Sequence, residues 1–145
     1  MYSIGQVSEI FQLPISTIRY YDKEGLLPNL KRANSGVRQF DEDAIEAIRV
    51  IECLKKAGTP IKDIKKFMVW CEQGPSTYEK RLKLFEDQKK NVEKEIKELE
   101  DTLNMISFKC WYYQEAVKQG NEQFTEGIPE KLPDNIKENY FKAHN

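Results

Sequence analysis

The stretch that decides the fold reads Ser16-Thr17-Ile18-Arg19-Tyr20-Tyr21-Asp22-Lys23-Glu24-Gly25-Leu26-Leu27-Pro28, and Gly36-Val37-Arg38-Gln39-Phe40 follows it closely. The first part predicts a helix over residues 15–24 that ends at Gly25, because glycine is favoured just past a helix C-terminus. The proline and glycines that come next predict that the chain turns rather than continuing as helix.

The flanking residues complete a compact pattern around this helix. Ser3 and Gln6 have the spacing of a capping box and predict a first helix over residues 3–11. Asn34-Ser35-Gly36 predicts the tip of a short two-stranded ribbon. Helix, turn, helix and ribbon in this order are typical of a winged helix-turn-helix, a module that reads double-stranded DNA.

Three further helices are expected after the ribbon. Asp41 is a suitable cap for a helix that runs to Gly58, and Thr59-Pro60 is a suitable start for the next helix, which runs to about Gly74. Ser76 and Glu79 then have capping-box spacing and predict the start of a very long helix that ends at Gly120.

The long helix has a seam whose steps alternate between three and four residues, the heptad pattern of a coiled coil. Lys89 is the charged residue that interrupts it. We expect this narrow stripe to mediate self-association into a dimer, although a long helix packed on its own head is the alternative. The predicted dimer interface comprises Leu82, Phe85, Val92, Ile96, Leu99, Leu103, Ile106, Cys110, Tyr113 and Val117.

These patterns predict a mainly helical protein. A winged helix-turn-helix head with four helices and a two-stranded wing occupies residues 1–75, a coiled-coil dimerisation helix occupies residues 76–120, and residues 121–145 form a tail or small cap. Apolar residues are 39% and charged residues 32% of the chain, which suits a small head with an exposed long helix better than one large core.

Charge and cysteine content narrow the class further. The net charge is only −1, but residues 16–38 hold five basic residues against two acidic ones, a local basic patch of the kind that phosphate contact requires. We find no run of about 20 apolar residues and no signal peptide. Three widely spaced cysteines do not suggest a disulfide framework. We expect a cytoplasmic, reduced protein with no membrane contact.

The second helix is expected to lie in the major groove, because arginine pairs with guanine and hydroxyls bond phosphates or base edges. Ribbon residues would meet flanking phosphates, and a lysine at the start of the fourth helix would add another contact. For Tyr21 the alternative is a place in the core, and for each lysine it is a solvated charge. The predicted DNA contacts are Ser16, Thr17, Arg19, Tyr20, Tyr21, Lys23, Arg32, Arg38 and Lys62.

The region from Tyr2 to about Glu72 resembles the MerR family of transcription regulators, with Arg19-Tyr20-Tyr21 and Gly36-x-Arg38 where that family places groove and wing contacts. The resemblance implies an antiparallel dimer that binds a near-palindromic promoter, in which the spacer between the two promoter elements is too long for RNA polymerase. Bending and untwisting of this DNA would realign the two elements for the polymerase. Val37 stands where the family usually has tyrosine, and Pro14 where serine or threonine often caps the helix.

The residues around Cys53 are similar to the branch of MerR-like regulators that respond to reactive aldehydes and other thiol-modifying electrophiles. Nearby basic residues would favour a thiolate at Cys53, while the alternative is a small buried hydrophobe. Cys71 of one subunit and Cys110 of the other could instead form a soft-metal site, and the aromatic residues of 108–113 could line an effector pocket or anchor the tail. We expect no cofactor and no resident metal.

Two other function classes fit the sequence less well than a DNA-binding regulator. A coiled-coil adaptor that binds a protein partner would have no need of Arg32 and Arg38 beside Arg19. An enzyme is disfavoured because the sequence has no nucleophile–base pair, no phosphate-binding loop, and a single histidine one residue from the C-terminus.

Overall fold

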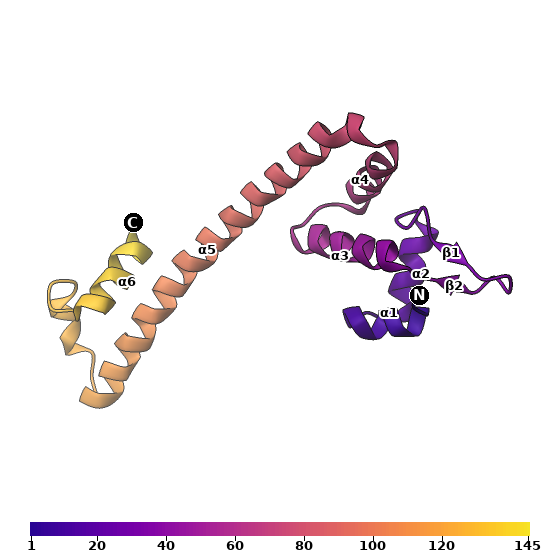
Figure 1. Ribbon diagram of the computed structural model, residues 1–145. Helices are drawn as coiled ribbons and strands as arrows, with labels where there is room; N and C mark the ends of the chain where they lie inside the picture. Colours follow the sequence, from indigo (N-terminus) through magenta and orange to yellow (C-terminus); the bar gives the residue numbers. More distant parts are fainter. The chain divides into compact units, whose positions relative to one another are not determined.

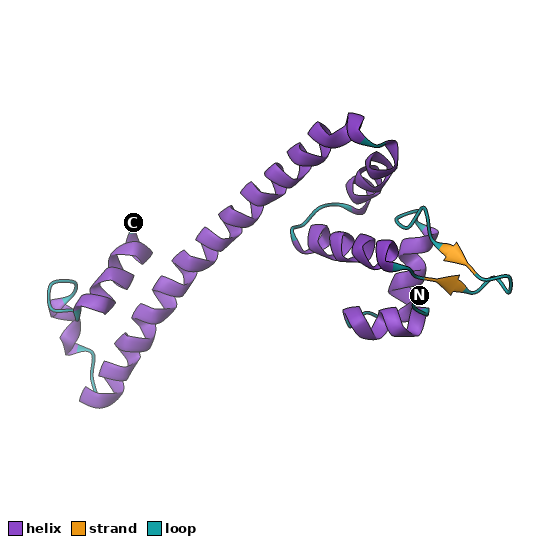
Figure 2. Cartoon of the chain, in the orientation of Figure 1, coloured by secondary structure: helices purple, strands orange, loops and turns teal.

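The computed structural model describes residues 1–145, which form two compact units, Met1–Asn91 and Val92–Asn145. The first unit contains α1 (Ile4–Phe11), α2 (Ile15–Lys23), β1 (Lys31–Arg32), β2 (Arg38–Gln39), α3 (Glu42–Lys56), α4 (Ile61–Gln73), the short 3₁₀ helix η1 (Pro75–Thr77) and the start of α5 (Tyr78–Gln119) (Figure 1). The second contains the rest of α5, the 3₁₀ helix η2 (Gln123–Gly127) and α6 (Asp134–His144). The predicted fold class is confirmed, with strands confined to the wing (Figure 2).

The predicted capping box at the start of α1 is present. The Ser3 hydroxyl accepts a hydrogen bond from the Gln6 backbone at 3.2 Å, and the Gln6 side chain accepts one from the Ser3 backbone at 2.9 Å. Gln12 ends α1 in the left-handed conformation, with φ of 54°. α2 then begins after Pro14 without a side-chain cap, so its position depends on packing rather than on local capping.

The wing is a two-stranded antiparallel ribbon in which Arg32 lies opposite Arg38. Its tip needs a residue with positive φ, and Gly36 supplies it at 86°. Beyond the ribbon, the backbones of Tyr2 and Phe40 exchange two hydrogen bonds of 2.7 and 2.9 Å. The N-terminal end of the chain is therefore tied to the base of the wing.

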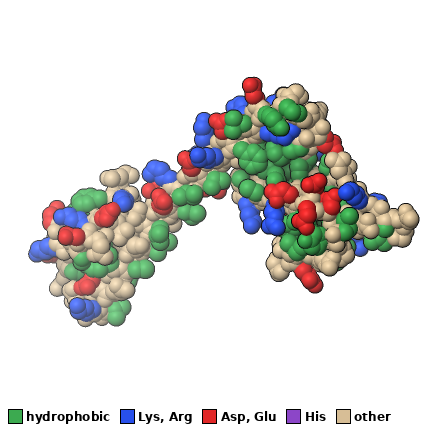
Figure 3. All heavy atoms as spheres, in the orientation of Figure 1, with side chains coloured by type: hydrophobic (Ala, Val, Ile, Leu, Met, Phe, Trp, Pro, Cys, Tyr) green, Lys and Arg blue, Asp and Glu red, His purple; other side chains and the backbone are tan.

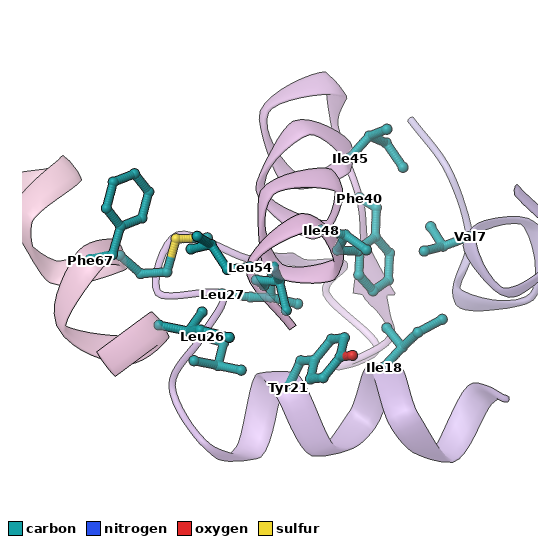
Figure 4. Close-up of a cluster of buried hydrophobic side chains, with 13 residues drawn as sticks. Val7, Ile18, Tyr21, Leu26, Leu27, Phe40, Ile45, Ile48, Leu54 and Phe67 are labelled. Carbon is teal, nitrogen blue, oxygen red and sulfur yellow. The ribbon is translucent and has the colours of Figure 1, made fainter. Parts of the chain in front are cut away.

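α3 and α4 enclose the core of the first unit. Asp41 caps α3 as predicted, accepting from the Ala44 backbone at 2.9 Å. The predicted cap at Thr59 is wrong: Pro60 occupies the N-cap position of α4, while the Thr59 hydroxyl is buried and has no partner. Figure 4 shows apolar side chains from α1, α2, α3 and α4, from the loop after α2 and from Phe40 just after β2 meeting in one cluster. Its most deeply buried members are Val7, Ile18, Tyr21, Leu26, Phe40, Ile48, Ile51, Leu54 and Ile64.

The junction between α4 and α5 differs from the prediction. Ser76 and Glu79 form no capping box; residues 75–77 make a 3₁₀ turn, and the buried Thr77 hydroxyl lies 2.7 Å from the Trp70 carbonyl oxygen. The Arg81 guanidinium donates to the Trp70 carbonyl at 3.0 Å and to the Gly74 carbonyl at 2.9 Å. A side chain from the second turn of α5 thus satisfies the free carbonyls at the end of α4.

In the second unit, α6 folds back along the end of α5 (Figure 1). Phe108 is buried beneath it, with ring centroids 5.1 Å from Tyr140 and 5.9 Å from His144. The Asn139 amide also donates to the Asn104 side chain at 2.9 Å. These contacts are those expected if the aromatic residues anchor the C-terminal segment. None of the helices combines the length and apolar character that crossing a membrane requires.

Candidate nucleic-acid interface

The outer face of α2 carries most of the residues predicted to meet DNA. Ser16, Arg19, Tyr20 and Lys23 are exposed, and Thr17 is half-buried. Ile18 and Tyr21, on the opposite face of α2, are buried in the core. An amphipathic helix of this kind presents a continuous polar surface of about two turns, which fits the major groove.

Tyr21 lies in the core, which corrects the predicted groove contact. Only 1% of its surface is exposed. Its hydroxyl donates to the Glu52 carboxylate of α3 and accepts from the Lys55 ammonium at 2.6 Å. Burial and the hydrogen bond to Glu52 raise the pKa of the Tyr21 phenol well above its ordinary value. The hydroxyl therefore stays protonated and available as a donor to Glu52.

The two wing arginines are both held by one carboxylate of α2. Asp22 Oδ2 accepts from Arg32 at 2.9 Å and from Arg38 at 2.7 Å. Arg32 also donates to the Gly36 carbonyl at 2.9 Å, while Arg38 is the less exposed of the two. Asp22 was not among the residues predicted from the sequence, where its only signal is that it is one of two acidic residues in the basic stretch.

α4 contributes basic residues next to the end of α2. Lys62 is exposed in the first turn of α4. One turn further, the Lys65 side chain lies against Gly25, where an added Cβ would sit 3.3 Å from Lys65 Cε. Lys65 was also missed at the sequence level, because its proximity to α2 depends on how α4 packs.

The three cysteines differ in their surroundings. Cys53 is exposed on α3, so the alternative of a buried hydrophobe does not apply to it. Burial raises the pKa of the Cys71 thiol, and the positive charge of Arg81 acts in the opposite direction. Cys110 is exposed on α5. No three His, Cys, Asp or Glu side chains of the chain come together as a metal site would require.

The predicted seam of α5 is largely uncovered in the single chain. Apolar side chains line its surface in Figure 3. Val92 is half-buried, and the ring of Phe85 packs edge-on against Phe67 at 5.3 Å. The exposed members of the seam are Leu82, Phe85, Ile96, Leu99, Leu103, Ile106, Cys110, Tyr113 and Val117.

Two helices joined by a short turn, with a basic ribbon fastened to the second helix, define the class of winged helix-turn-helix proteins. Comparison with known proteins narrows this class. Residues 2–69 match the family model described as "MerR HTH family regulatory protein". An HTH-type transcriptional regulator of Haemophilus influenzae is 39% identical over 120 residues, covering 83% of this chain and 89% of that protein.

Two solved structures agree with this result. The crystal structure of HiNmlR, a MerR family regulator lacking the sensor domain and bound to promoter DNA, is 38% identical, with a TM-score of 0.75 over 84% of this chain and 97% of HiNmlR. A MerR family regulator from Bacillus thuringiensis is 46% identical, with a TM-score of 0.70 over 75% of this chain and 96% of that one. The chain belongs to the MerR family and is a transcriptional regulator, not an enzyme.

Proposed function

We propose that this regulator binds a near-palindromic promoter duplex as a homodimer. Residues 1–75 form the DNA-binding part, with α2 in the major groove and the wing on flanking phosphates. The dimer forms through residues 76–120, and residues 121–145 cap the end of that helix. HiNmlR, which is 38% identical, was solved bound to promoter DNA, and this supports the assignment of the head.

The observation that carries this proposal is the arrangement around Asp22. Its carboxylate holds Arg32 and Arg38 next to the helix that exposes Arg19 and Tyr20. Each arginine has more N–H donors than Asp22 occupies, and the remaining ones are free to bond phosphates. One continuous surface can then contact base edges through α2 and bind DNA phosphates through the wing arginines.

Lys62 would extend this surface along the DNA backbone. It lies in the first turn of α4, where unpaired backbone N–H groups and the helix dipole favour an anion. A phosphate at this point would meet a positive side chain and the helix N-terminus together. Tyr21 is left out of the proposed surface because it is buried.

The seam of α5 supports the homodimer. Its exposed apolar residues continue over most of a 42-residue helix. Contiguous exposed apolar surface of this kind marks an interaction site. Two antiparallel copies would carry two reading helices to two half-sites. Bending and untwisting between the half-sites would realign the promoter elements, so that RNA polymerase is affected through the DNA.

Cys53 is the proposed point of effector action, through reaction with a thiol-modifying electrophile such as an aldehyde. Its exposure supports this role, since a buried thiol could not react. To test it, the protein is treated with a mild aldehyde or quinone and adducts are mapped by mass spectrometry. Adducts on Cys53 are expected; modification of Cys71 or Cys110 with Cys53 untouched would reject this role.

The DNA-binding proposal is tested by selecting binding sites from a random duplex pool and sequencing them. We expect an enriched inverted repeat with a fixed half-site spacing. Equal, weak binding to every duplex would contradict the proposal. Retention of one stoichiometric protein partner from a lysate, without DNA retention, would favour an adaptor instead.

A further inference from the structure

We propose that Tyr21 and Asp22 determine DNA-site specificity without contacting DNA. Tyr21 fixes the orientation of α2 on α3, and Asp22 fixes the wing arginines on α2. This inference rests on the proposed function, because it assumes that Arg19 and Tyr20 read DNA. It divides four consecutive residues of α2 into two that face the DNA and two that position them.

The Tyr21 hydroxyl makes every side-chain hydrogen bond between α2 and α3. It donates to Glu52 and accepts from Lys55 at 2.6 Å. The Lys55 ammonium also lies 5.2 Å from the centre of the Tyr21 ring and 3.6 Å from Glu52. One phenol, one carboxylate and one ammonium thus form a closed group across the two helices, which we call the α2–α3 link.

The α2–α3 link fixes the rotation of α2 about its own axis, which apolar packing does not fix. Apolar contacts are non-directional, so α2 could turn about its axis while keeping Ile18 and the Tyr21 ring buried. A turn of about 20° moves an atom on the rim of a helix by roughly 2 Å. Donor–acceptor distances tolerate only about 0.5 Å. A hydroxyl held from two sides therefore determines where the Arg19 guanidinium meets a base.

Asp22 has an equivalent role for the wing. Arg32 and Arg38 are directly opposite each other in the ribbon, and like charges in that position are destabilising. Both donate to the same oxygen of Asp22, which offsets this repulsion and ties the ribbon to α2. Without the carboxylate, the two guanidinium groups would separate and the wing would lose its fixed position.

The Asp22 part is tested with Asp22→Asn, measuring Kd for a duplex from the site selection and for a scrambled duplex. We expect the Kd for the selected site to rise about tenfold, because two charge-assisted hydrogen bonds lose their anion. The Kd for scrambled DNA should stay the same or fall, because the protein gains net positive charge. A general loss of folding would instead raise both values.

Asp43→Asn is the matched control, since Asp43 is exposed, lies in the same unit and forms no ion pair. It makes the same change of charge without touching Arg32 or Arg38. If Asp22→Asn and Asp43→Asn shift the two Kd values alike, Asp22 acts only through its charge and its positioning role is rejected.

The Tyr21 part is tested with Tyr21→Phe, which keeps the buried ring and removes only the hydroxyl. We expect the ratio of scrambled to selected Kd to fall about threefold to tenfold, while the salt dependence on scrambled DNA is unchanged. Tyr78→Phe, on an exposed tyrosine, should leave the ratio unaltered. Glu52→Gln, which retains an acceptor, should reduce the ratio less than Glu52→Ala.

The outcomes separate this inference from the proposed function. If Arg19→Ala relaxes site preference while Tyr21→Phe and Asp22→Asn leave it unchanged, the DNA-binding proposal stands and the positioning roles are rejected. If no duplex is enriched in the selection at all, the proposed function itself fails. A normal unfolding transition for each variant, measured by circular dichroism, shows that the comparison is made on folded protein.

Discussion

At the residue scale, α2 alternates between exposed and inward-facing side chains within a single turn. Tyr20 is 44% exposed while Tyr21, its neighbour, is 1% exposed. Successive residues of a helix are separated by about 100°, so adjacent tyrosines cannot share a role. The chemistry follows the geometry: the outward tyrosine is free to meet DNA, and the inward one hydrogen-bonds to α3.

Arg19→Ala should weaken binding to the selected duplex by about 1–3 kcal/mol and relax the preference at one base position, because a bidentate contact to a base is lost. Binding to scrambled DNA should weaken only slightly. Both are measured as Kd at fixed salt by fluorescence anisotropy.

Two further variants sharpen this prediction. Arg19→Lys keeps the charge but not the planar guanidinium, and should lose most of the preference at that base position. Arg49→Ala removes an exposed arginine of α3 that pairs only weakly, at 3.6 Å from Glu46, and should behave like the unmodified protein. Equal losses for Arg19→Ala and Arg49→Ala would mean that Arg19 contributes charge alone.

At the element scale, the joint between α4 and α5 depends on one arginine. Arg81 donates to the carbonyls of Trp70 and Gly74 and to the Thr77 hydroxyl, at 2.9–3.0 Å. Arg81→Ala should cost about 1–3 kcal/mol of unfolding free energy in urea, because the Trp70 and Gly74 carbonyls would be left to share the single hydrogen of the Thr77 hydroxyl. Arg81→Lys should recover little of the lost free energy of unfolding, since an ammonium cannot reach several acceptors at once as the planar guanidinium does. Full recovery with lysine would show that only charge matters there.

The packing of α6 on α5 depends chiefly on Phe108. Its ring is 4% exposed and contacts the rings of Tyr140 and His144. Phe108→Ala should cost about 3–5 kcal/mol within the second unit, and hydrogen exchange should accelerate over residues 134–144 while the first unit keeps its protection. Phe141→Ala, at a residue 45% exposed, is the control and should change little. Unchanged exchange in Phe108→Ala would show that α6 is held by other contacts.

At the scale of the whole molecule, the seam of α5 predicts one antiparallel register for the proposed homodimer. A parallel pair would place Lys89 against Lys89 of the partner subunit, which costs stability. In an antiparallel pair, each three-residue spacing along the seam must lie opposite a three-residue spacing of the partner helix. The numbers of the two residues that face each other therefore add up to the same value in every layer. Pairing Tyr78 with the partner's Val117 meets this condition, leaves no member of the seam unpaired, and places Phe85 against the partner's Cys110.

Phe85→Cys in a Cys53→Ser, Cys71→Ser background should therefore form a disulfide with the partner's Cys110 under mild oxidation. The covalent dimer is measured on a non-reducing gel. Glu86→Cys, one residue away and off the seam, is the control and should cross-link far less. Val92→Cys cross-linking in place of Phe85→Cys would indicate a register displaced by one heptad, and no cross-linking at any seam position would reject the dimer surface.

The sequence alone determined the features that depend on neighbours within about four residues. The Ser3–Gln6 capping box, the Asp41 cap and the glycine at the tip of the wing were all predictable, because the interacting groups lie close together in the chain. The heptad of α5 was also readable, since helical periodicity is a local property. These signals were sufficient for the fold class and for the exposed face of α2 that we propose meets DNA.

Only the tertiary structure decided the contacts that join distant parts of the chain. Tyr21 and Glu52 are 31 residues apart, and Asp22 and Arg38 are 16 apart. The sequence offered the core as the alternative for Tyr21, but no local pattern shows that its hydroxyl will bond Glu52, or that one aspartate will hold two arginines. The start of α5 differs from the predicted Ser76–Glu79 capping box for the same reason. The side chains of Thr77 and Arg81 hydrogen-bond to the Trp70 carbonyl at the end of α4, a contact that depends on how α4 and α5 meet. Hydrogen-bonding groups are paired according to where packing buries them, and that depends on the whole fold.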